Sequence, residues 1–422
     1  MKVLIISHNS LSSTSSIGKT LATLFYGFEK EELCQIYIHK TLPRDDICTS
    51  YYNFTDKDVL KGVFTRTVNG VEAKPDLSPQ SADSGVLNAF TYGSSLKREP
   101  YMEILREFVW KISPWYNDRL KEWVSEQKPT CIFAAIGSGT FLYDIALKIS
   151  KDFGIPIVTY ICDDFYNMPK PKKIFGGLWK RNINKKTKEL LHGSSAVAGI
   201  CDGISETYGK EFGIKHYTVM TGTSFSVKSE VAPRREVKNI CYFGKISLNR
   251  YFSLLDICKS LDRINEKLGT HYCLNIFCDK PNQKVLNEFT KTKSAVFRGF
   301  VTGKDFEREF FLSDALIFVE AFDKVSIDRV KNSVSTKIAD SLASGIPLFA
   351  YAPADIAATR HLTDNNCAVV CSDKNKLEFE LEQFLSGGEI RALICENALA
   401  TAKKFHDPAA VSRKLYEAIE NI

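Results

Sequence analysis

The chain has 422 residues and a formal net charge of +6, with 44% hydrophobic and 25% charged residues. A chain of this length exceeds one ordinary hydrophobic core and fits two domains, and its composition is typical of a soluble globular protein. No apolar run approaches the roughly 20 residues that a membrane-spanning helix needs, which argues against an integral membrane protein.

The start of the chain, M-K-V-L-I-I-S-H-N-S, has too short an apolar core for a signal peptide and predicts a first β-strand. We therefore expect a cytoplasmic protein. The 12 cysteines form no C-x-x-C pair, and several lie inside apolar runs, which favours reduced core thiols. Cys367 and Cys371 fit one strand, and the seven histidines have no H-x-x-x-H spacing, so no metal site is expected.

Apolar runs alternate with helical patterns along the first half of the chain. Helical periodicity covers residues 101–124 and 141–153. The strand-like runs are residues 3–6, 36–38, 131–136, 157–161 and 196–200. This alternation predicts a parallel, doubly wound α/β sheet. Residues 66–95, rich in Gly, Ser, Pro and Asp, are predicted to form a long loop.

The second half repeats this plan. Its strand-like runs are residues 240–243, 273–277, 295–298, 315–319, 347–351 and 368–371. The polar, aperiodic stretch 221–235 separates the halves, and we place the boundary near Glu230. The sequence therefore predicts two Rossmann-like domains, residues 1–229 and 230–407, followed by a helix at residues 408–422.

Basic residues are concentrated between Lys170 and Lys188, where eight lysines and arginines occur without an acidic residue. An anionic membrane surface attracts each nearby basic residue by about 1 kcal/mol. The segment therefore predicts either a solvated loop or a membrane or acceptor patch. The residues of this patch are Lys172, Lys173, Phe175, Trp179, Lys180 and Arg181. No nucleic-acid-binding motif accompanies it.

Gly18-Lys19-Thr20 suggests a phosphate-binding P-loop, but the spacing is wrong. A P-loop needs glycine five residues before Gly18, and that position is Ser13. Gly18 therefore indicates either a loop that lets the backbone approach a ligand or close packing of a helix on a strand.

The most informative segment is residues 332–347, N-S-V-S-T-K-I-A-D-S-L-A-S-G-I-P. Ser333, Ser335 and Thr336 offer hydroxyl groups where a helix should begin, and free backbone amides at a helix start favour an anion. Asp340 follows Thr336 by four residues, about 6 Å along the helix axis. Gly345 and Pro347 should end the helix.

Asp163 and Asp164 follow the strand-like run 157–161, at the carboxyl end where sites of α/β proteins lie. Adjacent side chains of an extended chain point to opposite faces, so one of them can face a cleft. That one is a candidate to orient or deprotonate an acceptor hydroxyl, whereas the other should stabilise the loop.

Together these segments resemble GT-B-fold glycosyltransferases, particularly the retaining, family-four-like enzymes that build bacterial surface polysaccharides. Similar motifs are V-F-R-G-F at 296–300, S-D-A-L-I-F-V-E at 313–320 and Y-F-G-K-I-S-L-N-R at 242–250. The first half matches more loosely, through residues 154–166 and 198–208. The resemblance implies two domains facing across a cleft and a last helix that crosses back to the first domain.

The resemblance also implies roles for individual residues. Asp340 would bind the nucleotide ribose, and Ser333, Ser335, Thr336 and Lys337 the diphosphate. Gly244, Lys245 and Arg250 would meet the diphosphate after a strand, where two cations can replace a metal ion by stabilising the leaving group. Gly18 would approach the donor. Glu320 would contact the donor sugar or pair with Arg329 or Lys331.

One position departs from the family. Many of these enzymes carry two glutamates separated by seven residues, and here Asn332 and Asp340 occupy those positions. We therefore expect a cofactor-free, metal-independent glycosyltransferase that uses a nucleotide-sugar donor and a glycan or lipid-linked acceptor. The alternative is a catalytically silent, sugar-nucleotide-binding scaffold of a polysaccharide assembly complex.

Overall fold

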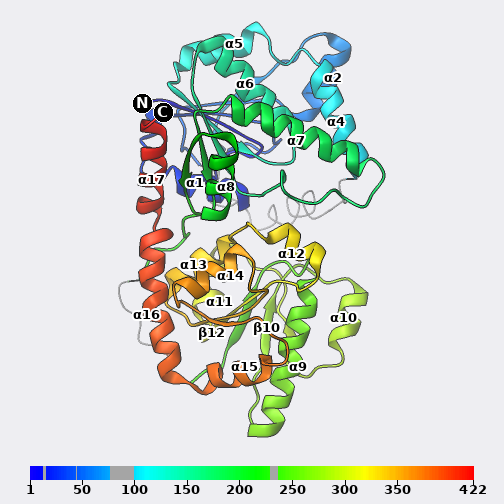
Figure 1. Ribbon diagram of the computed structural model, residues 1–422, viewed down its shortest axis with the longest axis vertical. Helices are drawn as coiled ribbons and strands as arrows, with labels where there is room; N and C mark the ends of the chain where they lie inside the picture. Colours follow the sequence, from blue (N-terminus) through cyan, green and yellow to red (C-terminus); the bar gives the residue numbers. More distant parts are fainter. Residues whose placement is uncertain (13–15, 44, 77–98, 229–235) are drawn as a thin grey trace. The chain divides into compact units, whose positions relative to one another are not determined.

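The computed structural model describes residues 1–12, 16–43, 45–76, 99–228 and 236–422. The chain divides into two compact units (Figure 1). Unit 1 contains Met1–Val219 and Ser412–Ile422, and unit 2 contains Met220–Val411. The predicted boundary near Glu230 lies outside the described residues.

Unit 1 is built on a parallel sheet with one antiparallel edge strand. The strand order among its described residues is β4-β3-β2-β1-β5-β6-β7-β8, and β4 pairs with β3 in the antiparallel sense. The strands are β1 (Val3–Ser7), β2 (Leu33–Tyr37), β3 (Ser50–Asn53), β4 (Val71–Ala73), β5 (Cys131–Ile136), β6 (Ile157–Ile161), β7 (Ala196–Gly199) and β8 (Lys215–Thr218). Thus the predicted loop at residues 66–95 is wrong in part, because it contains β4, and residues 77–95 lie outside the described chain.

The helices of unit 1 follow the expected alternation with one correction. They are α1 (Ser16–Leu24), η1 (Lys30–Glu32), α2 (Asp56–Thr65), α4 (Pro100–Ile112), α5 (Asp118–Gln127), α6 (Phe141–Phe153), α7 (Gly176–His192), α8 (Asp202–Phe212) and α17 (Pro408–Glu420), which enters unit 1 at Ser412. The single helix predicted over residues 101–124 is wrong, since α4 and α5 are separate. Ser113 is extended because Pro114 follows it and disfavours helical backbone.

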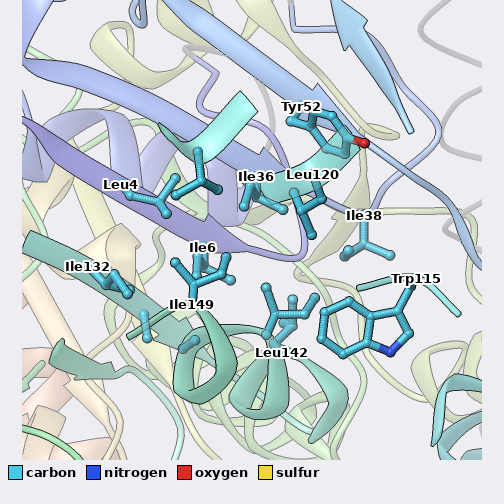
Figure 2. Close-up of a cluster of buried hydrophobic side chains, with 14 of the residues drawn as sticks. Leu4, Ile6, Ile36, Ile38, Tyr52, Trp115, Leu120, Ile132, Leu142 and Ile149 are labelled. Carbon is cyan, nitrogen blue, oxygen red and sulfur yellow. The ribbon is translucent and has the colours of Figure 1, made fainter. Parts of the chain in front are cut away.

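Aliphatic side chains from the sheet and from α6 form the core of unit 1 (Figure 2). Leu4 and Ile6 of β1 and Ile132 of β5 meet Leu142 and Ile149 of α6, and all five are at most 3% exposed. Full burial of each such side chain contributes about 1.5–3 kcal/mol. Because β1, β5 and β6 run parallel, their carboxyl ends lie at the same edge of this packed sheet.

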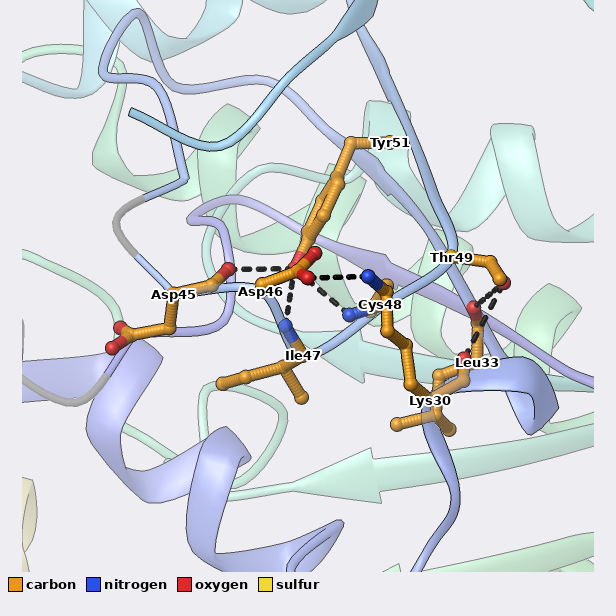
Figure 3. A network of polar contacts seen from close by, with 8 residues as sticks. All are labelled: Lys30, Leu33, Asp45, Asp46, Ile47, Cys48, Thr49 and Tyr51. Atoms are coloured by element: carbon orange, nitrogen blue, oxygen red, sulfur yellow. Dashed lines mark hydrogen bonds and ion pairs between the residues drawn. The ribbon is translucent and has the colours of Figure 1, made fainter. Parts of the chain in front are cut away.

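A hydrogen-bonded turn anchors β3 beside β2 (Figure 3). The Tyr51 hydroxyl accepts from the backbone amides of Ile47 (3.1 Å) and Cys48 (2.9 Å), and it donates to the carbonyl of Asp45 (3.0 Å). The Thr49 hydroxyl donates to a carbonyl at the start of β2 (2.8 Å). β3 is short and half polar, so these local bonds define its register where apolar alternation does not.

Unit 2 contains a parallel six-stranded sheet within its described residues, in the order β11-β10-β9-β12-β13-β14. The strands are β9 (Ile240–Phe243), β10 (Leu274–Phe277), β11 (Ala295–Phe297), β12 (Ala315–Val319), β13 (Leu348–Tyr351) and β14 (Val369–Cys371). The helices are α9 (Arg250–Leu268), α10 (Gln283–Phe289), α11 (Gly303–Phe311), α12 (Lys324–Val330), α13 (Thr336–Ser344), α14 (Ala357–Asp364), α15 (Leu377–Ser386) and α16 (Gly388–Phe405). The predicted α/β class, with two Rossmann-like parallel sheets, is confirmed.

Candidate functional site

Two adjacent strands of unit 2, β9 and β12, run parallel and end at the same edge of the sheet. Gly244 and Lys245 follow β9, and Glu320 follows β12. The carboxyl edge of a parallel sheet is the usual location of a ligand site in such folds. The sequence therefore places a backbone turn, a cation and a carboxylate at the position where a ligand is expected.

Arg250 and Glu320 form a two-bonded ion pair at this edge. Arg250 is the first residue of α9, and its Nε and Nη2 atoms each donate to a Glu320 carboxylate oxygen at 2.8 Å. Glu320 is only 4% exposed. Burial lowers the pKa of Arg250, but the charge and hydrogen bonds of Glu320 outweigh this effect and raise it. The predicted partners of Glu320, Arg329 and Lys331, are therefore wrong, because the β9–α9 turn brings Arg250 closer.

Lys337 converges on the same edge from the second position of α13. Its Nζ lies 5.1 Å from the centre of the Tyr242 ring. A Cβ atom on Gly244 would lie 1.9 Å from this Nζ, so any larger residue there would displace the end of the lysine side chain. Gly244 also has a φ of 140°, which other residues rarely adopt. The lysine and the glycine thus form one packed arrangement.

Electrostatics make Lys337 unusual. Burial, together with the charges of Arg250 and Lys245, lowers its pKa to about 8, and the charge of Glu320 opposes these effects. Within the described residues, its ammonium group makes no hydrogen bond or ion pair. Lys245 is exposed, and in the described part of the chain its ammonium group also makes no hydrogen bond or ion pair. Three cations therefore surround one buried carboxylate, an excess of positive charge suited to an anion.

The start of α13 adds backbone donors to these cations. Ser335 is the N-cap, and its hydroxyl accepts from the amide of Lys337 at 3.4 Å. Thr336 begins the helix and is exposed, whereas Ser333 is half-buried in the preceding turn. The helix ends at Gly345, which has a φ of 67°, as predicted. The amide dipoles at this helix start favour negative charge near Lys337.

Asp340 lies deeper on the same helix and is 8% exposed. Its carboxylate accepts from the amide of Ser224 (2.7 Å), the hydroxyl of Thr223 (3.1 Å) and the hydroxyl of Ser224 (3.4 Å). The carboxylate thus binds the first segment of unit 2, which sequence reasoning treated as linker. Asn332, eight positions earlier, is half-buried.

In unit 1, the two aspartates after β6 differ in their contacts and in their exposure to solvent. Asp164 accepts hydrogen bonds from the Tyr208 hydroxyl, from the Asn167 amide (3.0 Å) and from the Asn167 side chain (3.1 Å). These are the contacts of a loop-stabilising residue. Asp163 is exposed. Of the two candidates for the acceptor side, Asp163 is therefore the more accessible to a ligand.

The predicted patch between Lys170 and Lys188 is only partly at the surface. Lys172, Phe175 and Arg181 are exposed. Lys173 pairs with Glu99 at 2.5 Å. Trp179 is 8% exposed, and Lys180 donates to the carbonyls of Phe165 (2.7 Å) and Tyr166 (2.6 Å), so the structure turns both inward, against the prediction. They pack inward because α7 begins at Gly176 and its apolar side faces the unit 1 core.

Gly18 lies in the first turn of α1, and its carbonyl accepts from the amide of Ser12 at 3.3 Å. Ser13 lies outside the described residues. Among the residues that the structure describes, no group of three or more His, Cys, Asp or Glu side chains could hold a metal ion.

No protein-family model matches the chain, and no curated protein sequence matches it. Solved structures do. HepE from Anabaena, in complex with UDP and glucose, has a TM-score of 0.63 at 12% identity, and all of each chain is covered. Trehalose 6-phosphate synthase from Burkholderia multivorans has a TM-score of 0.62 at 11% identity, covering 100% of this chain and 98% of the other. Sucrose-phosphate synthase from Thermosynechococcus elongatus has a TM-score of 0.60 at 10% identity, with 100% and 98% covered.

This chain has a GT-B fold. Identities this low establish the fold and leave the site to be argued from its own residues. Two features of that site were missed by sequence reasoning. The convergence of Lys337 on Gly244 has only a weak signal, a glycine directly after a buried strand. The bonds from residues 223 and 224 to Asp340 have none, because a polar aperiodic stretch indicates only a linker.

Proposed function

We propose that this GT-B protein is a metal-independent glycosyltransferase that moves a sugar from a nucleotide-sugar donor to a hydroxyl group of a glycan or lipid-linked glycan. The observation that carries the proposal is the excess of positive charge around Lys337, whose ammonium group makes no hydrogen bond or ion pair among the described residues. The similar HepE structure contains UDP and glucose, which supports a nucleoside diphosphate as the anion.

The reaction breaks the bond between the sugar's anomeric carbon and the diphosphate oxygen, which leaves with the electron pair. The acceptor oxygen bonds to the anomeric carbon and loses its proton. Lys337 and Lys245, with the amides at the start of α13, would stabilise the charge that grows on the leaving diphosphate. Because Glu320 holds Arg250 in place, this cation is preorganised and needs little rearrangement during transfer.

Other assignments rest on the family resemblance. Asp340 would bind a ribose hydroxyl in exchange for one of its bonds to residues 223 and 224. Asp163 would orient or deprotonate the acceptor hydroxyl, and retention of anomeric configuration is the expected outcome. The proposal of metal independence is supported by the cations, which would perform the role that a divalent ion has elsewhere.

The test is thermal unfolding in chelator with UDP, GDP, ADP and CMP, for the wild type and for Lys337→Gln. A ligand at 100 times its dissociation constant stabilises a protein by about 2.7 kcal/mol. We expect one nucleotide to stabilise the wild type and to lose most of this effect in the variant. Lys267→Gln, which removes an exposed lysine at the far end of α9, is the matched control. Equal stabilisation of all three proteins by the nucleotide would show that Lys337 is not part of the binding site.

The second candidate function is a catalytically silent nucleotide-sugar binder, favoured by Asn332 at a position where related enzymes carry glutamate. Both candidates bind nucleotide, so binding does not separate them. Release of the nucleoside diphosphate from a donor sugar does. An enzyme produces it in the presence of acceptor, whereas a silent binder saturates and releases none.

A further inference from the structure

Helix α4 in unit 1 exposes an apolar stripe to solvent. Tyr101, Leu105, Phe108 and Ile112 are spaced by four, three and four residues, so they lie along one side of the helix. Their exposed fractions are 51%, 62%, 56% and 49%. A surface helix normally turns such a stripe toward the core. We call these four residues the α4 stripe.

The polar side of α4 is used inside unit 1. Arg106 pairs with Asp56 of α2 at 2.8 Å and lies 4.4 Å from the centre of the Phe141 ring. Glu107 accepts from the backbone amide of Thr140 at 2.6 Å. These contacts fix the rotation of α4, so the stripe cannot turn inward without breaking them. Its exposure is therefore built into the fold.

Neighbouring elements extend the apolar surface. α4 packs against both α2 and α7, and Figure 1 shows the three helices together in the upper part of the drawing. Leu60 and Phe64 of α2 are 49% and 81% exposed. Ile174, Phe175 and Leu178, at the start of α7, are also more than half exposed. Exposed apolar side chains that cluster on packed neighbouring helices suit an interaction surface.

The exposed charge around the stripe is mostly positive, and the exposed acid of α2, Asp56, is paired with Arg106. The exposed residues of α4 are the stripe, Met102 and Lys111, so its exposed side carries one cation and no acid. Lys57 and Lys61 of α2, Lys172 and Arg181 are also exposed. Large apolar side chains bordered by lysine and arginine suit the boundary between the acyl chains and the phosphates of an anionic lipid layer.

We propose that the α4 stripe and the adjoining exposed apolar residues bind the surface of an anionic lipid bilayer. The apolar side chains enter the headgroup boundary, and Lys111, Lys172 and Arg181 face lipid phosphates. A second copy of the chain fits less well, because a symmetric contact would bring the two basic borders together. Among the described residues, no helix is long and apolar enough to cross a membrane. The proposal is independent of sugar transfer.

The test is co-sedimentation of the full chain with vesicles of phosphatidylcholine alone, or mixed with phosphatidylglycerol in equal parts. We expect tighter binding to the anionic vesicles. The double variant Leu105→Glu, Phe108→Glu should lower the partition coefficient by about tenfold or more, because it removes two inserted side chains. Lys111→Gln should lower it about fivefold on anionic vesicles only, the effect of about 1 kcal/mol per basic residue. Phe379→Glu, an exposed phenylalanine on α15 in unit 2, should change nothing.

Near-ultraviolet circular dichroism shows whether the double variant keeps its fold, because Trp110 lies on the buried side of the same helix. Vesicle binding unchanged by the double variant would overturn the proposal, as would no binding of the wild type to either vesicle. A wild-type dimer in analytical ultracentrifugation that the double variant dissociates, without vesicle binding, would assign the stripe to a second copy instead.

Discussion

The carboxyl edges of the two sheets carry polar residues in opposite states. In unit 2, the ammonium groups of Lys337 and Lys245 make no hydrogen bond or ion pair within the described chain, and the buried carboxylate of Glu320 is bonded to Arg250. In unit 1, Asp164 is already bonded to Tyr208 and to Asn167. Unpaired charge at a sheet edge indicates a ligand, whereas charge bonded to its own loop indicates structure. The difference supports the proposed donor site in unit 2 and leaves the acceptor side less defined.

The largest effect should come from separating Arg250 from Glu320. Glu320→Ala leaves a mostly buried guanidinium without its carboxylate, and breaking a buried pair costs about 3–5 kcal/mol. All four tryptophans lie in unit 1, so their fluorescence follows that unit alone, whereas far-ultraviolet circular dichroism follows both. We expect urea to unfold unit 2 earlier in the circular dichroism signal. An unshifted transition would mean that the pair is not needed for stability.

Gly244→Ala tests the same edge of unit 2 and should cause a smaller loss of stability. A left-handed backbone position costs a non-glycine residue about 1–3 kcal/mol, and the new methyl group would meet the ammonium of Lys337. We expect a loss of about 2 kcal/mol in unfolding free energy and weaker nucleotide binding by calorimetry. Gly269→Ala, at the C-cap of α9, has a similar strain with open space around it and serves as control. Weaker binding in both variants would point to strain rather than to Lys337.

Asp164→Ala tests the structural assignment in unit 1. The variant removes the acceptor of two hydrogen bonds from Asn167 and one from Tyr208, and bonds to charged groups contribute about 1.5–3 kcal/mol. We expect destabilisation near the lower end of this range in the tryptophan fluorescence transition. Asp163→Ala should shift that transition less than Asp164→Ala does and should lower the transfer rate. If Asp164→Ala abolished transfer at full stability, the roles of the two aspartates would be reversed.

Sequence reasoning reached most of the fold because buried parallel strands are continuous apolar runs. β6, β9 and β12 match the predicted ranges, whereas β3 and the edge strands β4 and β8 are short and partly polar and gave no such signal. At the site, residue types were predictable but partners were not. Arg250 and Glu320 are 70 residues apart and meet only because β9 and β12 are adjacent. Trp179 is buried because of the rotation of α7 about its axis. The glycines at the start of α7 weaken the helical pattern from which this rotation could have been predicted.

The smallest effect is a pH dependence of unit 2 that arises from Lys337. Burial lowers its pKa from 10.5 to about 8, so between these values the unfolded chain binds more protons than the folded one. The free energy of unfolding should therefore rise as the pH is raised from about 8 to 10.5, by an amount on the order of 1 kcal/mol. Lowering the pH back to 8 should reverse this gain. Lys337→Gln should lack the rise, whereas Lys267→Gln should retain it.

Nucleotide affinity should change in the opposite direction, weakening above about pH 8, because the ammonium that attracts the diphosphate loses its charge. A site in which stability increases with pH while anion binding decreases would identify one buried lysine as the source of both, and parallel changes would exclude it.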